Sequence, residues 1–209
     1  MNLAVFGATG PSGRELLKLA LEQGHRVTAS ARNPDKITDR HERLKVVKGD
    51  ILNPESVREA VAGADAVISV LGVRKLGKNT ILSDGTRNII AAMQSQNVRR
   101  FICETSLSVG DSLGQMSWIF EKVALPLLLK NAFADKEIQE KYVMQSQLDW
   151  TIVRPAMLTN GPRTGVYKTW VGKPTDPIRR KISRADVADF ILKQAASSEF
   201  TNRAVGLSY

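Results

Sequence analysis

The sequence predicts an α/β fold in which one mainly parallel, doubly wound sheet carries helices on both faces. Short apolar runs rich in valine and isoleucine alternate with helical patterns, which is typical of βαβ units. The 209 residues are enough for one domain of the larger α/β kind with a substantial core. A hydrophobic fraction of 43% and a charged fraction of 24% are ordinary for a globular protein. We therefore expect residues 1–209 to form a single domain.

The expected elements alternate along the chain, each defined by its apolar pattern and by the turn residues around it. Strands are expected at the short apolar runs, which cover residues 3–6, 26–30, 44–48, 66–70, 100–104, 150–153 and 205–207. Helices are expected over the amphipathic segments at residues 13–23, after Asn53-Pro54, at 80–95 and at 184–196. Gly24 ends the first helix and Ser183 caps the last, because glycine favours helix ends and serine helix starts.

A glycine-rich turn directly follows the first strand and opens the first helix. In dinucleotide-binding folds such glycines allow a tight turn, a close approach to a pyrophosphate and close packing of helix on strand. The first two glycines here are three apart instead of two, so these roles carry over approximately. The helix N-terminus supplies free N–H groups and a partial positive charge. The sequence therefore predicts a Rossmann fold with phosphate-binding residues Gly7, Thr9, Gly10, Pro11, Ser12, Gly13 and Arg14. The alternative is an ordinary glycine-rich turn without a ligand.

The end of the second strand indicates which dinucleotide binds. An acidic side chain there accepts hydrogen bonds from the adenosine ribose, whereas an arginine pairs with a 2′-phosphate. The segment from Ala29 to Asn33 contains no carboxylate, and Arg32 is placed for a bidentate contact with phosphate. Arg14 can add a second cation. A solvated surface arginine is the alternative for either residue alone, but together they favour NADP(H) over NAD(H).

Two further strand ends fit the adenosine half of a dinucleotide. Asp50 follows the third strand and can accept a hydrogen bond from the adenine amino group, while Ile51 can flank the ring. Leu71 and Gly72 end the fourth strand and can pass close to the adenosine and the pyrophosphate. An ordinary strand-ending turn is the alternative for both. In register with the glycine turn, these positions reinforce one another.

The net charge of +9 favours acidic ligands and suits a phosphate-rich cofactor. The basic residues are spread along the chain without a cluster interleaved with aromatic residues, so we expect no nucleic-acid partner. His25 and His41 lie in polar surroundings away from any metal-ligand spacing, and we expect no metal site.

The only cysteine, Cys103, lies in an apolar run, so we expect a buried core thiol and a reducing compartment. We expect no secretory leader, because the apolar run at residues 3–6 leads directly into the glycine turn. The longest apolar stretch, residues 118–129, is interrupted by Glu121 and Lys122 and is too short to span a bilayer. We therefore expect a cytoplasmic protein without a membrane span.

The segment from residue 105 to residue 149 is longer than one crossover helix requires. It contains two glycines, Gly110 and Gly114, and apolar groups on both sides of Pro126. Because it leaves the carboxyl edge of the sheet, where ligands bind, it can form a lid or wall over a flat hydrophobic substrate. The alternative is additional helical core.

Several motifs together carry a family resemblance that extends over nearly the whole chain. They are Phe6-Gly7-Ala8-Thr9-Gly10-Pro11-Ser12-Gly13, Gly49-Asp50, Leu71-Gly72-Val73-Arg74, Ser83-Asp84-Gly85-Thr86-Arg87-Asn88-Ile89, Thr105-Ser106 and Leu148-Asp149-Trp150-Thr151-Ile152-Val153-Arg154-Pro155. They resemble the atypical short-chain dehydrogenase/reductases, whose glycine turn has the wider spacing. Within these, the chain is most similar to the biliverdin reductase B group of NADPH-dependent flavin reductases.

Ordinary members of that superfamily use a serine, a tyrosine and a lysine, with the tyrosine four residues before the lysine. The phenol donates a proton to the substrate oxygen, and the lysine lowers the pKa of the phenol. Here Ser106 and Lys136 match the serine and the lysine, but Ala132 stands where the tyrosine is needed. Tyr142 lies six residues after the lysine and cannot take that place. The usual carbonyl-reducing triad is therefore absent.

The resemblance implies hydride transfer from the nicotinamide to a conjugated acceptor such as a flavin or a linear tetrapyrrole. Such an acceptor needs positioning more than a strong local acid, because solvent or a propionate supplies the proton. Ser106 then orients the reacting groups, and Lys136 steadies the nicotinamide ribose or an anionic substrate group. Pro155, within Arg154-Pro155-Ala156, borders the nicotinamide. A basic loop with Arg74, Lys75 and Lys78 follows the fourth strand, and it attracts propionates or a flavin phosphate, or is simply solvated. Arg74 is also expected to contact the cofactor.

The acceptor pocket is expected between segments at about 105–131 and 156–178, in a protein that acts on a small molecule as a monomer. One alternative is a non-enzymatic NADP(H)-binding regulatory or assembly protein, which the missing tyrosine supports equally well. Another is a quinone or carbonyl reductase with an unrecognised acid, for which Tyr142 and Tyr167 are poor candidates.

Overall fold

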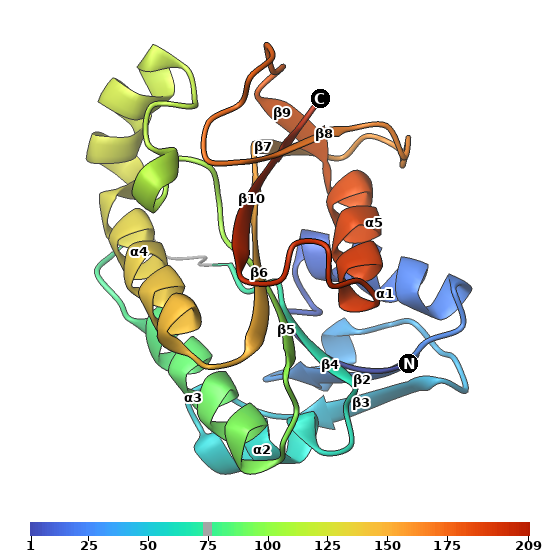
Figure 1. Cartoon of the computed structure of the whole chain (residues 1–209). Coiled ribbons are helices and arrows are strands. Elements are labelled where there is room, and N and C mark those ends of the chain that lie inside the picture. The colour runs from blue at the N-terminus through green and yellow to red at the C-terminus, as the bar shows by residue number, and fades with distance from the viewer. Residues whose placement is uncertain (73–76) are drawn as a thin grey trace.

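The structure is a computed structural model that describes residues 1–72 and 77–209, and an eight-stranded sheet forms its centre (Figure 1). Across the sheet the strands are β3 (Leu44–Lys48), β2 (Arg26–Ala31), β1 (Asn2–Phe6), β4 (Ala66–Ser69), β5 (Arg100–Glu104), β6 (Asp149–Pro155), β10 (Arg203–Ser208) and β8 (Lys168–Val171). All neighbouring pairs are parallel except β10 with β8. The expected mainly parallel, doubly wound sheet is confirmed.

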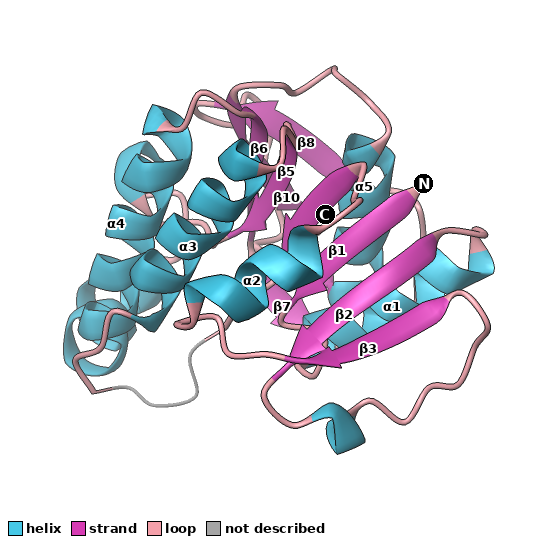
Figure 2. Ribbon diagram, turned by 90° about the horizontal axis from the view of Figure 1, so that it is seen from below, coloured by secondary structure: helices cyan, strands magenta, loops and turns pink. Residues whose placement is uncertain are grey.

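Helices cover both faces of the sheet (Figure 2). One face carries α1 (Pro11–Glu22) and α5 (Arg184–Ala195), which pack on each other, and the other carries α2 (Pro54–Val61), α3 (Ile81–Ser95) and α4 (Lys130–Gln145). Strand β1 shows why both faces are buried: Val5 joins the core under α1 and α5, whereas Phe6 joins the core under α2 and α3. A strand that is buried on both faces is apolar throughout.

Helix α1 begins two residues earlier than the sequence predicts. Gly10 is its N-cap and Pro11 its first residue. The fixed φ of proline suits the first helical position, where its missing N–H costs no hydrogen bond. The helix ends at Glu22, and Gly24 follows with a φ of +81°, which confirms its expected role after the helix.

The helix caps come from local and from distant side chains. Asn53 caps α2 by accepting from two N–H groups of its first turn, and Ser183 caps α5 by accepting from Asp186, so both expected starts are confirmed. Helix α3 has no side-chain cap at Thr80. Instead Asp135 of α4 accepts from the N–H of Leu82 at 2.9 Å and also binds Ser83, so one helix caps another.

The sequence did not predict three short strands after β6. Strands β7 (Met157–Thr159) and β9 (Lys181–Ser183) form a separate two-stranded parallel sheet, and β8 is the antiparallel edge of the main sheet. Each has three or four residues, too few for a clear alternation of apolar and polar side chains. The indole of Trp170 in β8 packs on Gly206 of β10, where a Cβ would be 2.2 Å from the ring. The edge strand is therefore fixed by packing between segments that are distant in sequence.

Candidate active site

The glycine-rich turn joins β1 to α1 beside β4, where the order of the strands reverses. Gly7 has a φ of +92°, and a Cβ on it would lie 2.5 Å from the carbonyl oxygen of Val70. A Cβ on Gly13 would lie 2.3 Å from the carbonyl oxygen of Gly7. Gly10 donates its N–H to that same carbonyl at 3.0 Å. Gly7 and Gly13 therefore allow the tight turn and the close packing for which glycine is needed.

The N-terminus of α1 has no side-chain cap and no acidic residue in its first turn. Pro11 occupies the first position, and Thr9 and Ser12 lie on either side of the helix start, both partly exposed. Uncapped N–H groups and the positive end of the helix dipole suit an anion. The local structure thus fits a pyrophosphate at this turn.

Two arginines lie around the loop that follows β2. Arg32 is exposed directly after the strand, and its neighbour Asn33 caps the short helix η1 (Pro34–Lys36). From α1, Arg14 donates from Nη2 to the carbonyl oxygen of Lys36 at 2.9 Å. The fold therefore brings both sequence-predicted cations to one loop.

The turn after β3 packs against α3. The carboxylate of Asp50 is exposed and accepts the N–H of Leu52 at 3.0 Å. Ile51 is half-buried, and a Cβ on Gly85 of α3 would lie 2.5 Å from its Cγ1. Ile51 therefore has a packing role in addition to any contact with adenine, and Gly85 leaves room for it.

The end of β4 provides an open position at the same edge of the sheet. Leu71 is half-buried, whereas a Cβ on Gly72 would meet nothing within 4 Å. Arg74, predicted to contact the cofactor, and Lys75 lie outside the residues that the structure describes. Lys78 is described and exposed.

The predicted catalytic residues come together beyond the ends of β5 and β6. The N–H of Thr105 donates to Val153 at 2.8 Å and that of Leu107 donates to Pro155 at 3.0 Å, so Ser106 lies between two paired residues and is half-buried. The ammonium of Lys136 donates to the carbonyl oxygen of Thr105 at 2.9 Å. Ser106, Lys136 and Pro155 thus form one group, although the sequence separates them by up to 49 positions (106 to 155).

No tyrosine hydroxyl is placed on α4 before Lys136. Ala132, one turn before the lysine, is only 4% exposed. The protein has three tyrosines, and all of them lie in the described residues. Tyr142 packs against the core under α2 and α3, whereas Tyr167 and Tyr209 donate to carboxylates of α5. The absence of the usual phenol is therefore a feature of the three-dimensional site as well as of the sequence.

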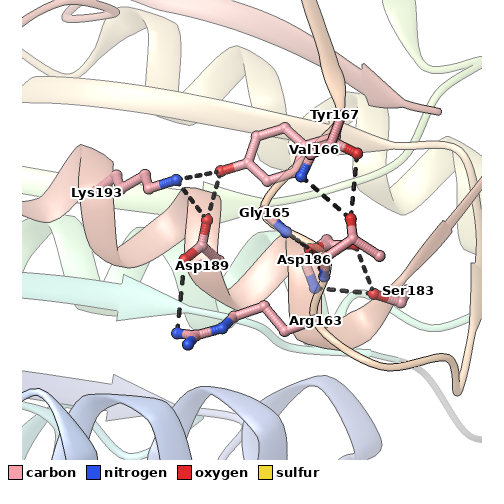
Figure 3. A network of polar contacts seen from close by, with 9 residues as sticks. Arg163, Gly165, Val166, Tyr167, Ser183, Asp186, Asp189 and Lys193 are labelled. Atoms are coloured by element: carbon pink, nitrogen blue, oxygen red, sulfur yellow. Dashed lines mark hydrogen bonds and ion pairs between the residues drawn. The ribbon is translucent and has the colours of Figure 1, made fainter.

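Tyr167, one of the candidate acids, belongs to a polar network along α5 (Figure 3). Its hydroxyl donates to Asp189 at 2.7 Å, and Lys193 forms an ion pair with the same carboxylate at 2.7 Å. Burial, together with Asp189, raises the pKa of Tyr167 to about 12. A second group in the network centres on Asp186, which accepts from the backbone N–H of Gly165 at 2.8 Å. These bonds hold the chain before β8 against α5.

Sequence reasoning missed a buried ion pair behind the site. Arg154 of β6 binds Glu140 of α4 through two contacts, Nε to Oε1 at 2.9 Å and Nη2 to Oε2 at 2.6 Å. Glu140 also accepts the hydroxyl proton of Thr105 at 2.6 Å, and Asp111 binds the outer side of Arg154. The side chain of Arg154 thus points into this network while Pro155 follows at the strand end. A charged pair spaced fourteen residues apart, with one member in an apolar strand, was the available signal.

A second missed residue is Glu104, which ends the apolar strand β5. It is 6% exposed and accepts the hydroxyl proton of Ser12 at 3.3 Å. Burial raises the pKa of Glu104, against the opposing influence of Lys136, Ser12 and Arg184. Desolvation lowers the pKa of Lys136, with Glu104 acting in the opposite direction. The site therefore contains a buried acid and a buried base whose charges depend on each other.

The two segments expected to line an acceptor pocket meet in a small apolar cluster. Leu107, Met116 and Ala156 form it, and the partly buried side chains of Phe120 and Trp170 pack against it. The cluster joins the segment after β5 to the segment after β6, next to Ser106.

The segment between Leu107 and α4 also presents apolar side chains to the outside. It includes the π-helical segment η3 (Phe120–Leu129), in which no residue is fully buried. Trp118 is 70% exposed and Leu127 is 76% exposed. Glu121 turns inward and accepts from the N–H groups of Gly114 at 3.0 Å and Met116 at 3.2 Å. The outer side of this segment is therefore apolar and exposed.

The sequence predicts neither membrane-spanning helices nor metal sites, and the structure bears on both. Across residues 1–72 and 77–209, no helix is both long and apolar enough to cross a membrane. Within the same residues, no three histidine, cysteine or acidic side chains are grouped so as to hold a metal ion. Cys103 is free and buried, as expected.

The fold and the glycine turn define a nucleotide-binding protein of the Rossmann class. The family described as NAD(P)H-binding matches residues 7–198. The chain therefore belongs to this family, within the atypical short-chain dehydrogenase/reductases.

Relatives of known sequence cover nearly the whole chain. A chloroplastic protein of Arabidopsis thaliana, which is named as uncharacterized, is 30% identical over 96% of this chain and 74% of its own length. The photosystem II assembly factor Ycf39 of Synechocystis is 30% identical over 92% of this chain, which spans 58% of that protein. Among solved structures, ChuY of Escherichia coli O157:H7, described as an anaerobillin reductase, is 27% identical with a TM-score of 0.82. That likeness covers 100% of this chain and 97% of ChuY.

Proposed function

We propose that this protein is an NADPH-dependent reductase that passes hydride to a planar, conjugated acceptor such as a flavin or biliverdin. The observation that carries the proposal is Ala132, buried on α4 where a carbonyl reductase needs its phenol. Reduction of an isolated carbonyl requires a local acid, whereas a conjugated acceptor distributes the added charge and takes its proton from solvent or from its own acid groups. The likeness to ChuY supports an acceptor of this class.

The cofactor fits the chain along the carboxyl edge of the sheet. The uncapped start of α1, with Thr9, Pro11 and Ser12, holds the pyrophosphate, and the open position at Gly72 leaves space beside it. Arg32 and Arg14 bind the 2′-phosphate and so select NADPH over NADH. Asp50 and Ile51 contact the adenine, and bound NADPH supplies the hydride.

The acceptor lies against the apolar cluster that joins segments 105–131 and 156–178. Leu107 and Ala156 are the buried apolar support of this wall, and the partly buried aromatic side chains of Phe120 and Trp170, which pack on the cluster, suit contact with a ring system. Ser106 orients the nicotinamide and the acceptor by hydrogen bonding. Lys136, held by the carbonyl oxygen of Thr105, binds the nicotinamide ribose or an anionic group of the acceptor. These residues contribute position and water exclusion rather than acid catalysis.

A panel assay tests the proposal directly. The oxidation of NADPH is followed at constant enzyme with flavin mononucleotide, biliverdin, a quinone and a small aldehyde. We expect turnover with the first two and none with the aldehyde. Lys136→Met should reduce turnover, whereas the matched control Lys141→Met, exposed on the same helix, should not. Turnover restricted to the aldehyde contradicts the proposal.

A second candidate function is a non-enzymatic NADP(H)-binding assembly or regulatory role. The similarity to Ycf39, named as a photosystem II assembly factor, favours it, and the missing phenol is compatible with it. Tight binding of NADPH without turnover on any acceptor in the panel would support this function instead.

A further inference from the structure

The carboxyl group of Glu104 lies directly behind the proposed pyrophosphate site. Ile102, two residues earlier in β5, faces the core beneath α1 and α5, and Glu104 faces the same side because side chains alternate along a strand. Its Oε1 accepts the hydroxyl proton of Ser12, the second residue of α1, at 3.3 Å. A buried acid therefore stands against the helix start at which we place two phosphate groups.

The polar and charged groups around Glu104 come from three helices. Helix α1 contributes the Ser12 hydroxyl, α5 contributes Arg184 at its first position, and α4 contributes Lys136. Lys136 is shared with other acids, since Glu140 and Asp135 also act on it, and its ammonium donates to a backbone carbonyl. The negative charge of ionised Glu104 is thus only partly balanced by nearby cations. Additional negative charge close to it makes the ionised form less favourable.

In the hydrogen bond between Ser12 and Glu104 the serine hydroxyl is the donor, and this determines what Ser12 can offer to a phosphate. A serine hydroxyl has one proton to donate, and a phosphate oxygen can only accept. While the ionised carboxylate of Glu104 accepts that proton, Ser12 has none to offer to a phosphate. If Glu104 carries a proton of its own, it donates to Oγ of Ser12, and the serine proton is then available to the phosphate.

We propose that pyrophosphate binding is coupled to the uptake of one proton by Glu104, which redirects the Ser12 hydroxyl from the carboxyl group to the phosphate. The proton comes from solvent, and no covalent bond to carbon or phosphorus changes. This inference rests on the proposed placement of the pyrophosphate at the start of α1, and it does not depend on which acceptor is reduced.

The direction in which cofactor affinity changes with pH follows from the linkage between cofactor binding and protonation of Glu104. Burial already raises the pKa of Glu104 in the free protein, and two phosphate charges raise it further in the complex. Affinity is therefore greatest below the free-protein pKa, falls by up to about tenfold per pH unit between the two pKa values, and then levels off. The dissociation constant for the cofactor should rise with pH.

Isothermal titration calorimetry with NADP⁺, in buffers of different ionisation enthalpy, measures both the dissociation constant and the protons taken up. Glu104→Gln mimics the protonated acid, because its neutral amide can donate to Ser12 permanently. We expect this variant to lose the proton uptake and to bind about tenfold more tightly than the wild type at the alkaline end of the profile. The 2′-phosphate ionises near pH 6 by itself, but it does so with both proteins, so their difference isolates Glu104.

Two controls keep the outcome interpretable. Glu15→Gln removes an exposed acid one turn further along α1, and it should leave the pH profile unchanged. Titration of the wild type with NAD⁺, which lacks the 2′-phosphate, needs no variant and should still show proton uptake even if Glu104→Gln does not fold. Equal pH profiles for the wild type and Glu104→Gln, or NAD⁺ binding without proton uptake, would overturn the inference. Proton-linked binding without turnover on the acceptor panel would instead contradict only the proposed reductase.

Discussion

The guanidinium of Arg154 and the carboxylate of Glu140 form a two-point ion pair in which both side chains are 3% exposed. The pair connects β6 to α4 and, through the hydroxyl of Thr105, reaches the loop that carries Ser106. Arg154 itself directly precedes Pro155 in β6. The position of the proposed catalytic group therefore depends on a charged contact behind it.

Arg154→Met should destabilise the fold by about 3–5 kcal/mol, because it leaves Glu140 buried without its partner. Urea unfolding followed by circular dichroism measures the change. The exposed pair of Arg99 with Asp149 is the control, and Arg99→Ala should cost no more than about 1 kcal/mol. Equal costs for the two variants would show that burial does not govern the Arg154 pair.

Asp135→Ala should destabilise the protein by about 2 kcal/mol, because the N–H groups of Leu82 and Ser83 at the start of α3 lose the carboxylate that accepts from them. Thermal unfolding checks this value. Asp84→Ala, which removes a half-buried acid from the first turn of the same helix, is the matched control and should have a much smaller effect. A similar loss of stability in both variants would mean that the contact of Asp135 with the start of α3 does not stabilise the protein.

Arg32→Ala should weaken NADPH binding by about tenfold to a hundredfold and leave NADH binding nearly unchanged, because a charged hydrogen bond contributes roughly 1.5–3 kcal/mol. Fluorescence titration with each cofactor measures the selectivity. Arg26→Ala, at the opposite end of β2 and also exposed, should change neither affinity. Unchanged NADPH affinity in Arg32→Ala would remove the basis for the cofactor preference.

Cys103 should not react with a disulfide reagent at pH 8 while the protein is folded. Burial raises the pKa of this thiol to about 12, so the reactive thiolate is scarce below that pH, and the side chain is inaccessible as well. The absorbance of the released thiolate reports the rate, which should rise sharply in denaturant. Rapid reaction of the folded protein would contradict the placement of Cys103 in the core.

The parts of the structure that could be predicted from sequence are those that depend on neighbouring residues. Gly7 and Gly13 indicated the turn, Asn53 and Ser183 indicated two helix starts, and alternating apolar runs indicated the parallel strands. Each signal is local, since a cap or a turn is completed within a few residues of chain.

The missed features depend on contacts between distant segments. Strand β8 pairs with β10, where Trp170 packs on Gly206, and α3 is capped by Asp135 from a helix about fifty residues further along. Neither contact leaves a pattern in the local sequence. The burial of Glu104 also depends on distant segments, so the local sequence indicated only that this residue ends an apolar strand.

The sequence by itself determined the class of fold, the nucleotide-binding turn and the lack of a tyrosine before Lys136, because these follow from residue types at fixed spacings. Only the tertiary structure decided that Ser106, Lys136 and Pro155 meet, and that Glu104 lies against Ser12. Burial and the distance to other charges determine whether an acid is ionised, and both are decided when the fold brings Ser12, Lys136 and Arg184 to the end of β5.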